Sequence, residues 1–486
     1  MKGQFFRDGV VYGGATLLTG LSTVAVVSIY THTIEQSAYG AVEYINVLQV
    51  LIQVVVGLEL TQAIARFYGG SEADEERRAY ASTGFWALVA VYGLVCTGLF
   101  LASERVEAAL LGGAFQRGIL RPALVSIYLA ILFYVVRSQL RWELRAARYA
   151  LASLITAVSI VGLSFYLLVE LRTGVIGVFV SSGVGYGLGV ASCLYGLRGT
   201  YAWSFDVRKL KTMLRFSTPL TLSSLALFAA SYGDRFVVRA TMGFDDLGVY
   251  AVGARVANVI ALASAGFQLG AAPLIYRHYR RPETPATLAQ LIRLFLSAGL
   301  VGVLALAAFS PTIVATLATA AYADAARVVP VLGLATVLAG GYIFLPGLTV
   351  NNMTSRFAAI NIAAAAMSLL LIAGLAQAYG VVGAAVGALG GASLGFGLHA
   401  FFSQRAYPRP LEWRRLVAAI GLVVAATAIG WSSGRPESVF LLGRIAVLVI
   451  SAAAVVMLVL NGTDRSMIRH LLARPLTSAR RPSTDP

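Results

Sequence analysis

Charged residues are scarce in this chain of 486 residues, since Asp, Glu, Lys and Arg together make up 12%. Soluble globular proteins carry about 25% charged residues, so this scarcity excludes an ordinary soluble domain. Hydrophobic residues make up 58% of the chain and gather in long apolar runs. A helix of about 20 apolar residues crosses the ~30 Å hydrocarbon core of a bilayer, so these runs predict a polytopic membrane protein.

Cysteine, histidine and lysine are also rare, and their scarcity removes several kinds of site. The two cysteines, Cys96 and Cys193, lie in apolar runs, which argues against a disulfide framework or a zinc site. The four histidines have no metal-ligand spacing, and no lysine stands in the G-x-x-x-x-G-K-[ST] motif of an ATPase. The polar loops are too short to hold the sugar donor of a membrane glycosyltransferase. We therefore expect a protein that is not an enzyme and has no organic or metal cofactor.

The apolar runs predict an all-α fold with about fourteen transmembrane helices. Short connections join nearly all of these helices, so we expect no soluble domain between them. The predicted spans cover residues 9–31, 41–65, 79–101, 119–140, 149–169, 174–196, 215–238, 248–273, 290–309, 328–350, 357–377, 380–402, 416–432 and 440–460.

Basic residues set the orientation of the predicted spans. If both termini lie in the cytoplasm, most of the 38 Lys and Arg residues fall in cytoplasmic loops, as the positive-inside rule requires. The net charge of +16 is then a basic surface beside anionic lipid headgroups, and it does not indicate a nucleic-acid site. We expect a multi-pass protein of the cytoplasmic membrane with a basic, disordered cytoplasmic tail over residues 461–486.

A weak internal repeat relates the two halves of the chain. A shift of 208 residues aligns the first predicted helix with the seventh and the second with the eighth, without a gap. This shift spans an even number of helices, so the halves should be pseudo-symmetric about an axis along the membrane normal. We expect six-helix lobes at 1–196 and 215–402, a cytoplasmic linker at 197–214 and two C-terminal helices within 403–460. The shift pairs Arg7 with Arg215, Thr33 with Thr241, Gly40 with Gly248 and Tyr68 with Tyr276.

Three stretches of the chain resemble a known family of membrane transporters. They are YTHTIEQSAYGAVEY from Tyr30, GLELTQAIARFY from Gly57 and SYGDRFVVRATMGFDDLGVY from Ser231. Together they resemble the polysaccharide-exporting flippases, which include the O-antigen and related lipid-linked oligosaccharide flippases. These flippases lie in a superfamily of multidrug, oligosaccharidyl-lipid and polysaccharide exporters. That superfamily also holds the multidrug and toxin extrusion transporters and the lipid II flippase.

This resemblance implies a transporter that flips a polyprenyl-pyrophosphate-linked oligosaccharide across the cytoplasmic membrane by alternating access, for polysaccharide, O-antigen or exopolysaccharide biosynthesis. Its partners would be the lipid-linked oligosaccharide, membrane lipids, and the glycosyltransferases and polymerase of the same pathway, with H⁺ or Na⁺ as the coupling ion. The alternative is a cation-coupled multidrug exporter of the same superfamily. The cleft of such an exporter should favour acids and aromatic residues, whereas the polar candidates here are mostly arginines and amides.

Charges within the seventh and eighth predicted spans are the first candidates for a substrate site. Asp234, Arg235, Arg255 and Asn258 lie at bilayer depth, where a charge is costly unless it faces protein, water or a partner. Arginine suits the pyrophosphate that the resemblance implies, because its planar guanidinium binds phosphate oxygens bidentately and keeps its charge. The alternative is a structural lock in which Asp234 pairs with an arginine of a neighbouring helix, Arg255 being one such mate.

The second predicted span carries amides and acids. Asn46, Gln49 and Gln53 share one helical face and are candidates for contacts with sugar hydroxyls, the alternative being hydrogen bonds between helices. Glu59 is a candidate ion-coupling residue, the alternative being an ion pair at the cytoplasmic end of the span. Glu43 lies near the outer end of the span, where we expect it to be solvated.

Arginines also follow the cytoplasmic end of the fourth predicted span at near-helical spacing. Arg137, Arg141 and Arg145, followed by Arg148, form this series. They are candidates for a site where the lipid phosphate enters from the inner leaflet. The alternative is a solvated helix extension that faces lipid phosphates without admitting them.

Overall fold

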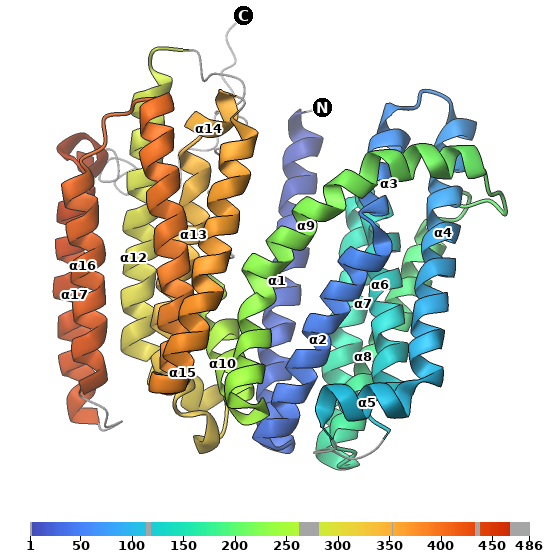
Figure 1. Ribbon diagram of the computed structural model, residues 1–486, viewed down its shortest axis with the longest axis horizontal. Coiled ribbons are helices and arrows are strands. Elements are labelled where there is room, and N and C mark those ends of the chain that lie inside the picture. Colours follow the sequence, from blue (N-terminus) through green and yellow to red (C-terminus); the bar gives the residue numbers. More distant parts are fainter. Residues whose placement is uncertain (1, 113–117, 262–280, 352, 433–437, 467–486) are drawn as a thin grey trace, which may run out of the picture. The chain divides into compact units, whose positions relative to one another are not determined.

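The computed structural model describes residues 2–112, 118–261, 281–351, 353–432 and 438–466, and all regular structure within these ranges is helical (Figure 1). The apolar composition explains this architecture, because a membrane-spanning helix satisfies its own backbone hydrogen bonds where no water is present. The chain divides into two compact units, each described by itself below. Unit 1 holds residues 1–255, 314–325 and 368–387, and unit 2 holds 256–313, 326–367 and 388–486.

Unit 1 contains the helices of the first half of the chain. Helix α8 packs against α6 and α7, and α1 packs against α7. The bounds are α1 Lys2–Thr33, α2 Gln36–Gly57, α3 Leu60–Gly70, α4 Asp74–Leu101, α5 Ser103–Leu111, α6 Leu120–Trp142, α7 Ala146–Phe165, the π-helix η1 Tyr166–Glu170, α8 Val175–Gly196, α9 Val207–Met242 and α10 Phe244–Ala257.

Unit 2 is built mainly from the later helices around an apolar core that includes Phe295, Phe344 and Leu300. Its one fully buried carboxylate–guanidinium pair among the described residues joins Asp464 to Arg293, with Nε–Oδ2 at 2.7 Å. The remaining elements of the chain are α12 Thr284–Leu317, η2 Ala320–Tyr322, α13 Ala325–Gly341, η3 Tyr342–Phe344, α14 Gly347–Val350, α15 Thr354–Ala406, α16 Trp413–Ser432 and α17 Ser438–Val459.

Asp464 shows that the described part of the predicted tail, residues 461–466, folds against unit 2. Burial of its carboxyl group would raise the pKa, but hydrogen bonds from Arg293 and from the backbone N–H of Asn461 outweigh it and hold the pKa below its usual value. Residues 467–486 of the predicted tail lie outside the described residues.

The predicted membrane spans fall on these helices, which confirms an all-α polytopic membrane fold. Ten segments among the described residues are long and apolar enough to cross a membrane. One of them contains both the 357–377 and 380–402 predictions, because α15 is broken only at Gly380, where φ is 63°. The predicted span 248–273 is described only as far as residue 261. The predicted division into lobes stays a prediction.

The second predicted span, 41–65, is not one continuous helix. Helix α2 ends at Gly57 and α3 begins at Leu60, and the two residues between them, Leu58 and Glu59, have φ of 46° and 52°. Consecutive non-glycine residues in the left-handed region are uncommon and cost about 1–3 kcal/mol each. The surrounding packing therefore holds a break that the apolar pattern does not reveal.

Helices α2 and α10 cross where two glycines bring their backbones together. A Cβ on Gly40 would collide with the carbonyl oxygen of Phe244, and a Cβ on Gly248 would lie 2.6 Å from the carbonyl oxygen of Gln36. The 208-residue shift that relates Gly40 to Gly248 also relates Gln36 to Phe244. The contact is therefore reciprocal, as it is between copies related by a two-fold axis.

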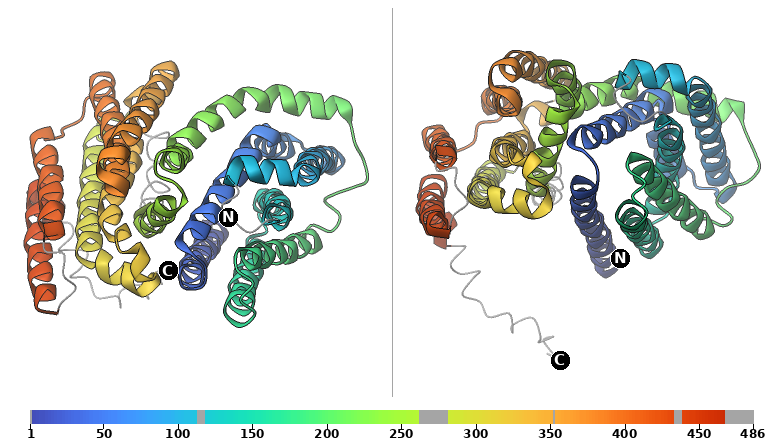
Figure 2. Two further views of the ribbon diagram at one scale, coloured as in Figure 1. Left: turned by 60° about the horizontal axis from the view of Figure 1, so that its bottom comes forward. Right: turned by 90° about the horizontal axis from the view of Figure 1, so that it is seen from below.

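Helix α9 bends along its length (Figure 2). Pro219 lies inside this helix. Its start is fixed by Asp206, whose side chain accepts hydrogen bonds from the backbone N–H groups of Arg208 and Lys209. The segment before it is tied to α4, since Trp86 donates to the carbonyl of Ala202 at 2.9 Å. Much of the predicted linker is thus fixed to its own unit.

Candidate functional site: a buried charge cluster and two pockets

Glu43 on α2 occupies the centre of a group of buried and half-buried charges in unit 1. Its carboxylate accepts a hydrogen bond from Nη2 of Arg255 at 2.8 Å and lies 3.7 Å from Nε of Arg235. The Glu43 side chain is 9% exposed, so the expectation that it is solvated is wrong. Helix α10 brings Arg255 to it because α2 and α10 approach closely at Gly40 and Gly248.

Asp234 completes the group from α9. It accepts hydrogen bonds from Nη1 of Arg235 at 2.8 Å and from the hydroxyl of Tyr250 at 2.7 Å. The five residues Glu43, Asp234, Arg235, Tyr250 and Arg255 are called the charge cluster below. It contains two carboxylates and two guanidinium groups, so its formal charges balance. Paired charges with further hydrogen bonds are the form in which intramembrane charges are tolerated.

The pairing differs from the structural lock that the sequence suggests. Asp234 pairs with Arg235 on its own helix, and the mate of Arg255 is Glu43 on another helix. Sequence reasoning missed Glu43 and Tyr250. The signal for Glu43 was available, since two arginines within spans need two acids and Glu43 is the other acid at the corresponding depth.

The guanidinium groups of the cluster keep unused donors. Nε of Arg235 and Nε of Arg255 are buried and have no hydrogen-bond partner among the described residues. The hydroxyl of Tyr39 is likewise buried and has no hydrogen-bond partner among the described residues. A buried donor without a partner is costly, so these atoms are places where a further acceptor would be favourable.

The amides of α2 lie along the same helix as Glu43. Asn46, Gln49 and Gln53 are half-buried, and their side chains have no hydrogen bond within the described part of the chain. Asn258 is exposed just beyond the end of α10 and belongs to unit 2. Its predicted association with Arg255 stays a prediction.

Glu59 lines a pocket of about 600 Å³ between α3 and α9. Gln62 and Arg66 line it from α3, and Ser223 and Ser224 from α9. Glu59 makes no ion pair with any described residue, so the pairing alternative lacks a partner there, and its ion-coupling role stays a prediction. The break between α2 and α3 places the carboxylate at this pocket.

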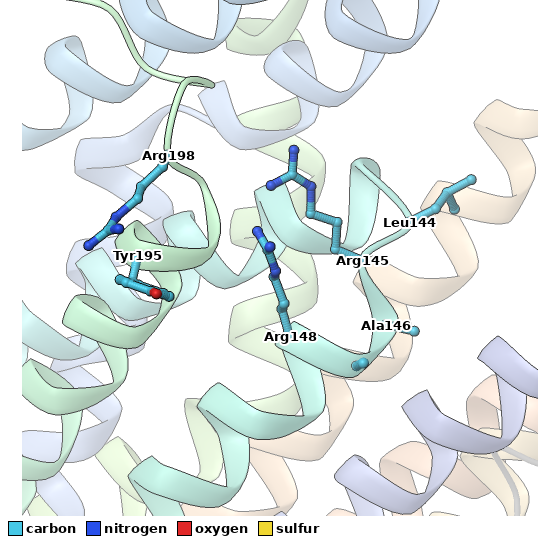
Figure 3. A pocket seen from close by; sticks show the side chains of 7 residues that line it. Leu144, Arg145, Ala146, Arg148, Tyr195 and Arg198 are labelled. Atoms are coloured by element: carbon cyan, nitrogen blue, oxygen red, sulfur yellow. The ribbon is translucent and has the colours of Figure 1, made fainter.

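A second pocket, of about 750 Å³, lies where α6, α7 and α8 end or begin (Figure 3). Of the three arginines predicted to admit lipid phosphate, Arg145 lines it, together with Arg148 and Arg198. Arg137 instead packs over Phe133, 4.9 Å from the ring centre. Arg141 is exposed.

Comparisons with known proteins agree with this architecture. The sequence model of a family described as "Polysaccharide biosynthesis protein" matches residues 33–264. No curated protein matches the chain. The fold is similar to that of the lipid II flippase MurJ in an inward closed conformation, with a TM-score of 0.68, 12% identity, 96% of this chain covered and 100% of that one.

Two structures of a multidrug resistance MATE family transporter of the MOP superfamily are similar as well. The inward-facing one has a TM-score of 0.64 and 17% identity over 82% of this chain and 95% of that one. The outward-facing one has a TM-score of 0.61 and 15% identity over 85% and 96%. The chain thus has a fold similar to those of the lipid II flippase and the MATE family transporter, and its residues 33–264 match the sequence model of a polysaccharide biosynthesis family.

Proposed function

We propose that this protein flips a polyprenyl-pyrophosphate-linked oligosaccharide from the inner to the outer leaflet of a prokaryotic cytoplasmic membrane, for polysaccharide assembly. The observation that carries the proposal is the family match over residues 33–264, because that segment contains every residue of the charge cluster. The similarity of fold to a lipid II flippase supports it, since lipid II transport is the activity named for that protein.

The charge cluster is the proposed contact for the pyrophosphate. In the described structure its arginines are neutralised by Glu43 and Asp234, so an incoming phosphate must compete with these carboxylates. The unused Nε donors of Arg235 and Arg255 give the phosphate its first hydrogen bonds. Protonation of a displaced carboxylate would offset one of the negative charges that the pyrophosphate brings, which gives H⁺ a direct part in coupling. Na⁺ near Glu59 is the other proposed coupling route.

Alternating access between the two predicted lobes is the proposed movement. The reciprocal contacts of Gly40 with Phe244 and of Gly248 with Gln36 support a pseudo-two-fold axis near α2 and α10. The existence of inward-facing and outward-facing structures of a similar fold supports movement between two such states. Both termini are proposed to lie in the cytoplasm, where glycosyltransferases of the same pathway would supply the substrate; a polymerase would use it on the outer side.

The competing function is multidrug export. It is favoured by the MATE structures, whose fold similarity is comparable to that of the flippase. The two functions predict different cargo, because an anionic pyrophosphate would engage the guanidinium groups of the cluster, whereas an organic cation would engage its carboxylates.

The test is transport in proteoliposomes that contain a fluorescent polyprenyl-pyrophosphate oligosaccharide. We expect the wild-type protein to move the sugar to the opposite leaflet and Arg255→Ala to slow this at least about tenfold. Arg105→Ala is the matched control, because Arg105 is an exposed arginine outside the cluster. If Arg255→Ala moves the sugar-lipid at the wild-type rate, the charge cluster is not a contact for the substrate. Movement of ethidium without movement of the sugar-lipid would establish drug export instead.

A further inference from the structure

The pocket at the ends of α6, α7 and α8 lies apart from the charge cluster and has a different charge balance. It is lined by the run from Leu144 to Arg148, by Tyr195 and by Arg198, and is called the arginine pocket below. All of these residues belong to unit 1. They come from the α6–α7 turn, the first turn of α7 and the end of α8, as Figure 3 shows.

The arginine pocket carries more positive than negative charge. Arg145 pairs with Glu143, with Nε–Oε2 at 2.8 Å. The other carboxylate oxygen of Glu143 already accepts hydrogen bonds from Thr200 and Gln139. Neither Arg148 nor Arg198 has a carboxylate partner among the residues that the structure describes. The pocket therefore has an excess of two formal positive charges.

Two of the guanidinium groups converge on a single neutral acceptor. Nη1 of Arg145 and Nη1 of Arg148 both donate to the carbonyl oxygen of Gly196 at the end of α8. Two like charges that share one carbonyl repel each other, and among the described residues the carboxylate of Glu143 pairs with Arg145 alone. Arg198 lies over the ring of Tyr195, 3.7 Å from its centre, and its guanidinium donates no hydrogen bond to any residue that the structure describes.

The backbone around the arginine pocket also favours a bound anion. Leu144 adopts a left-handed conformation with φ of 56°, and the turn is closed by a hydrogen bond from the N–H of Arg145 to the carbonyl of Leu140 at 2.9 Å. This tight turn aims the start of α7, which has no capping side chain, at the pocket. The first N–H groups of a helix of this length favour an anion.

The rim of the arginine pocket is apolar and exposed. Leu144 is 71% exposed and Tyr195 is 63% exposed. Exposed apolar and aromatic side chains beside arginines are typical of a protein surface that meets lipid headgroups. The predicted topology places this end of α6, α7 and α8 at the inner leaflet.

We propose that the arginine pocket is a binding site for a phosphate group, held by Arg148 and Arg198 together with Arg145. A phosphate diester or pyrophosphate would accept from the guanidinium forks and relieve the repulsion between Arg145 and Arg148. The phosphate could come from a lipid headgroup in the inner leaflet or from a soluble phosphate compound. This site does not depend on the proposed transport of a sugar-lipid.

The test measures direct binding to the full-length protein in detergent. The probes are short-chain phosphatidic acid and inorganic pyrophosphate, and the readout is the dissociation constant at fixed, low salt. We expect Arg148→Gln with Arg198→Gln to weaken binding by about tenfold per arginine removed. Arg105→Gln, in an exposed arginine on α5, is the matched control and should bind like the wild type.

Each outcome decides the proposal. Binding of phosphatidic acid alone that the double variant loses assigns the site to a lipid headgroup. Loss of pyrophosphate binding alone assigns it to a soluble phosphate compound, and loss of both assigns it to phosphate in general. Absence of binding by the wild type, or binding unchanged in the double variant, overturns the proposal. If the double variant does not fold, Arg198→Gln alone serves, because that side chain is exposed and lies over the exposed ring of Tyr195.

Discussion

Glu43 is the residue that holds the charge cluster together, because it is the only carboxylate within 4.0 Å of both cluster arginines among the described residues. A buried ion pair is a weak source of net stability, but removal of one partner leaves an unpaired buried charge and is strongly destabilising. A pair retained at this depth therefore either specifies the packing of α2 against α10 or takes part in transport. Variants of the two partners can separate these roles.

Glu43→Gln is expected to lower the free energy of unfolding by about 3–5 kcal/mol, because Arg255 loses its carboxylate. Glu43→Gln combined with Arg255→Gln should recover most of this loss, since neither charge is then left alone. The measurement is thermal unfolding in detergent, beside sugar-lipid transport in proteoliposomes. If the double variant is both stable and fully active in transport, the pair is only a structural lock.

At the scale of elements, the crossing of α2 and α10 sets where the cluster forms. The two helices approach through Gly40 and Gly248, and each glycine faces a backbone carbonyl that cannot move as a flexible side chain would. The break after Gly57 has a comparable role further along the same chain, because it places Glu59 at the pocket beside α9. Local backbone geometry thus positions both candidate acids of the second predicted span.

Gly40→Ala is expected to destabilise the protein by about 3 kcal/mol, at the upper end of the cost of overpacking, because the new Cβ collides with the carbonyl of Phe244. Gly98→Ala on α4 is the matched control, since no atom lies within 4 Å of its added Cβ. Alanine also has the better helix propensity, so the control should be neutral or more stable. Equal thermal unfolding midpoints for the two variants would contradict the close crossing of α2 and α10.

At the scale of the whole molecule, the distribution of basic residues predicts the orientation in the membrane. The net charge of +16 is large for a protein with so few charged residues, and a positive-inside arrangement gives it a place beside anionic headgroups. This predicted orientation places the arginine pocket and the segment after α8 on the cytoplasmic side, and α5 on the outer side.

Single cysteines test this orientation in a variant that lacks Cys96 and Cys193. Cysteine at exposed Arg105 on α5 should react with a membrane-impermeant maleimide in intact cells. Cysteine at exposed Ser204, before α9, should react only after the membrane is permeabilised. The reverse labelling pattern would invert the topology and place the arginine pocket at the outer leaflet.

The sequence by itself determined the membrane class, the positions of most spans and the family resemblance. Each of these depends on local composition or on a short motif, because about 20 consecutive apolar residues specify a span whatever packs beside it. It also located Arg235 and Arg255 as charges that need compensation.

Only the tertiary structure decided which carboxylates compensate the charges of Arg235 and Arg255. Glu43 and Arg255 are 212 residues apart in sequence, and their contact follows from the crossing of two helices. Packing between helices also holds the break at Leu58 and Glu59. It likewise brings Arg198, beyond the end of α8, to the pocket of Arg145 and Arg148. Ion pairs and left-handed backbone at non-glycine residues are imposed by packing over long sequence distances, so no local pattern carries them.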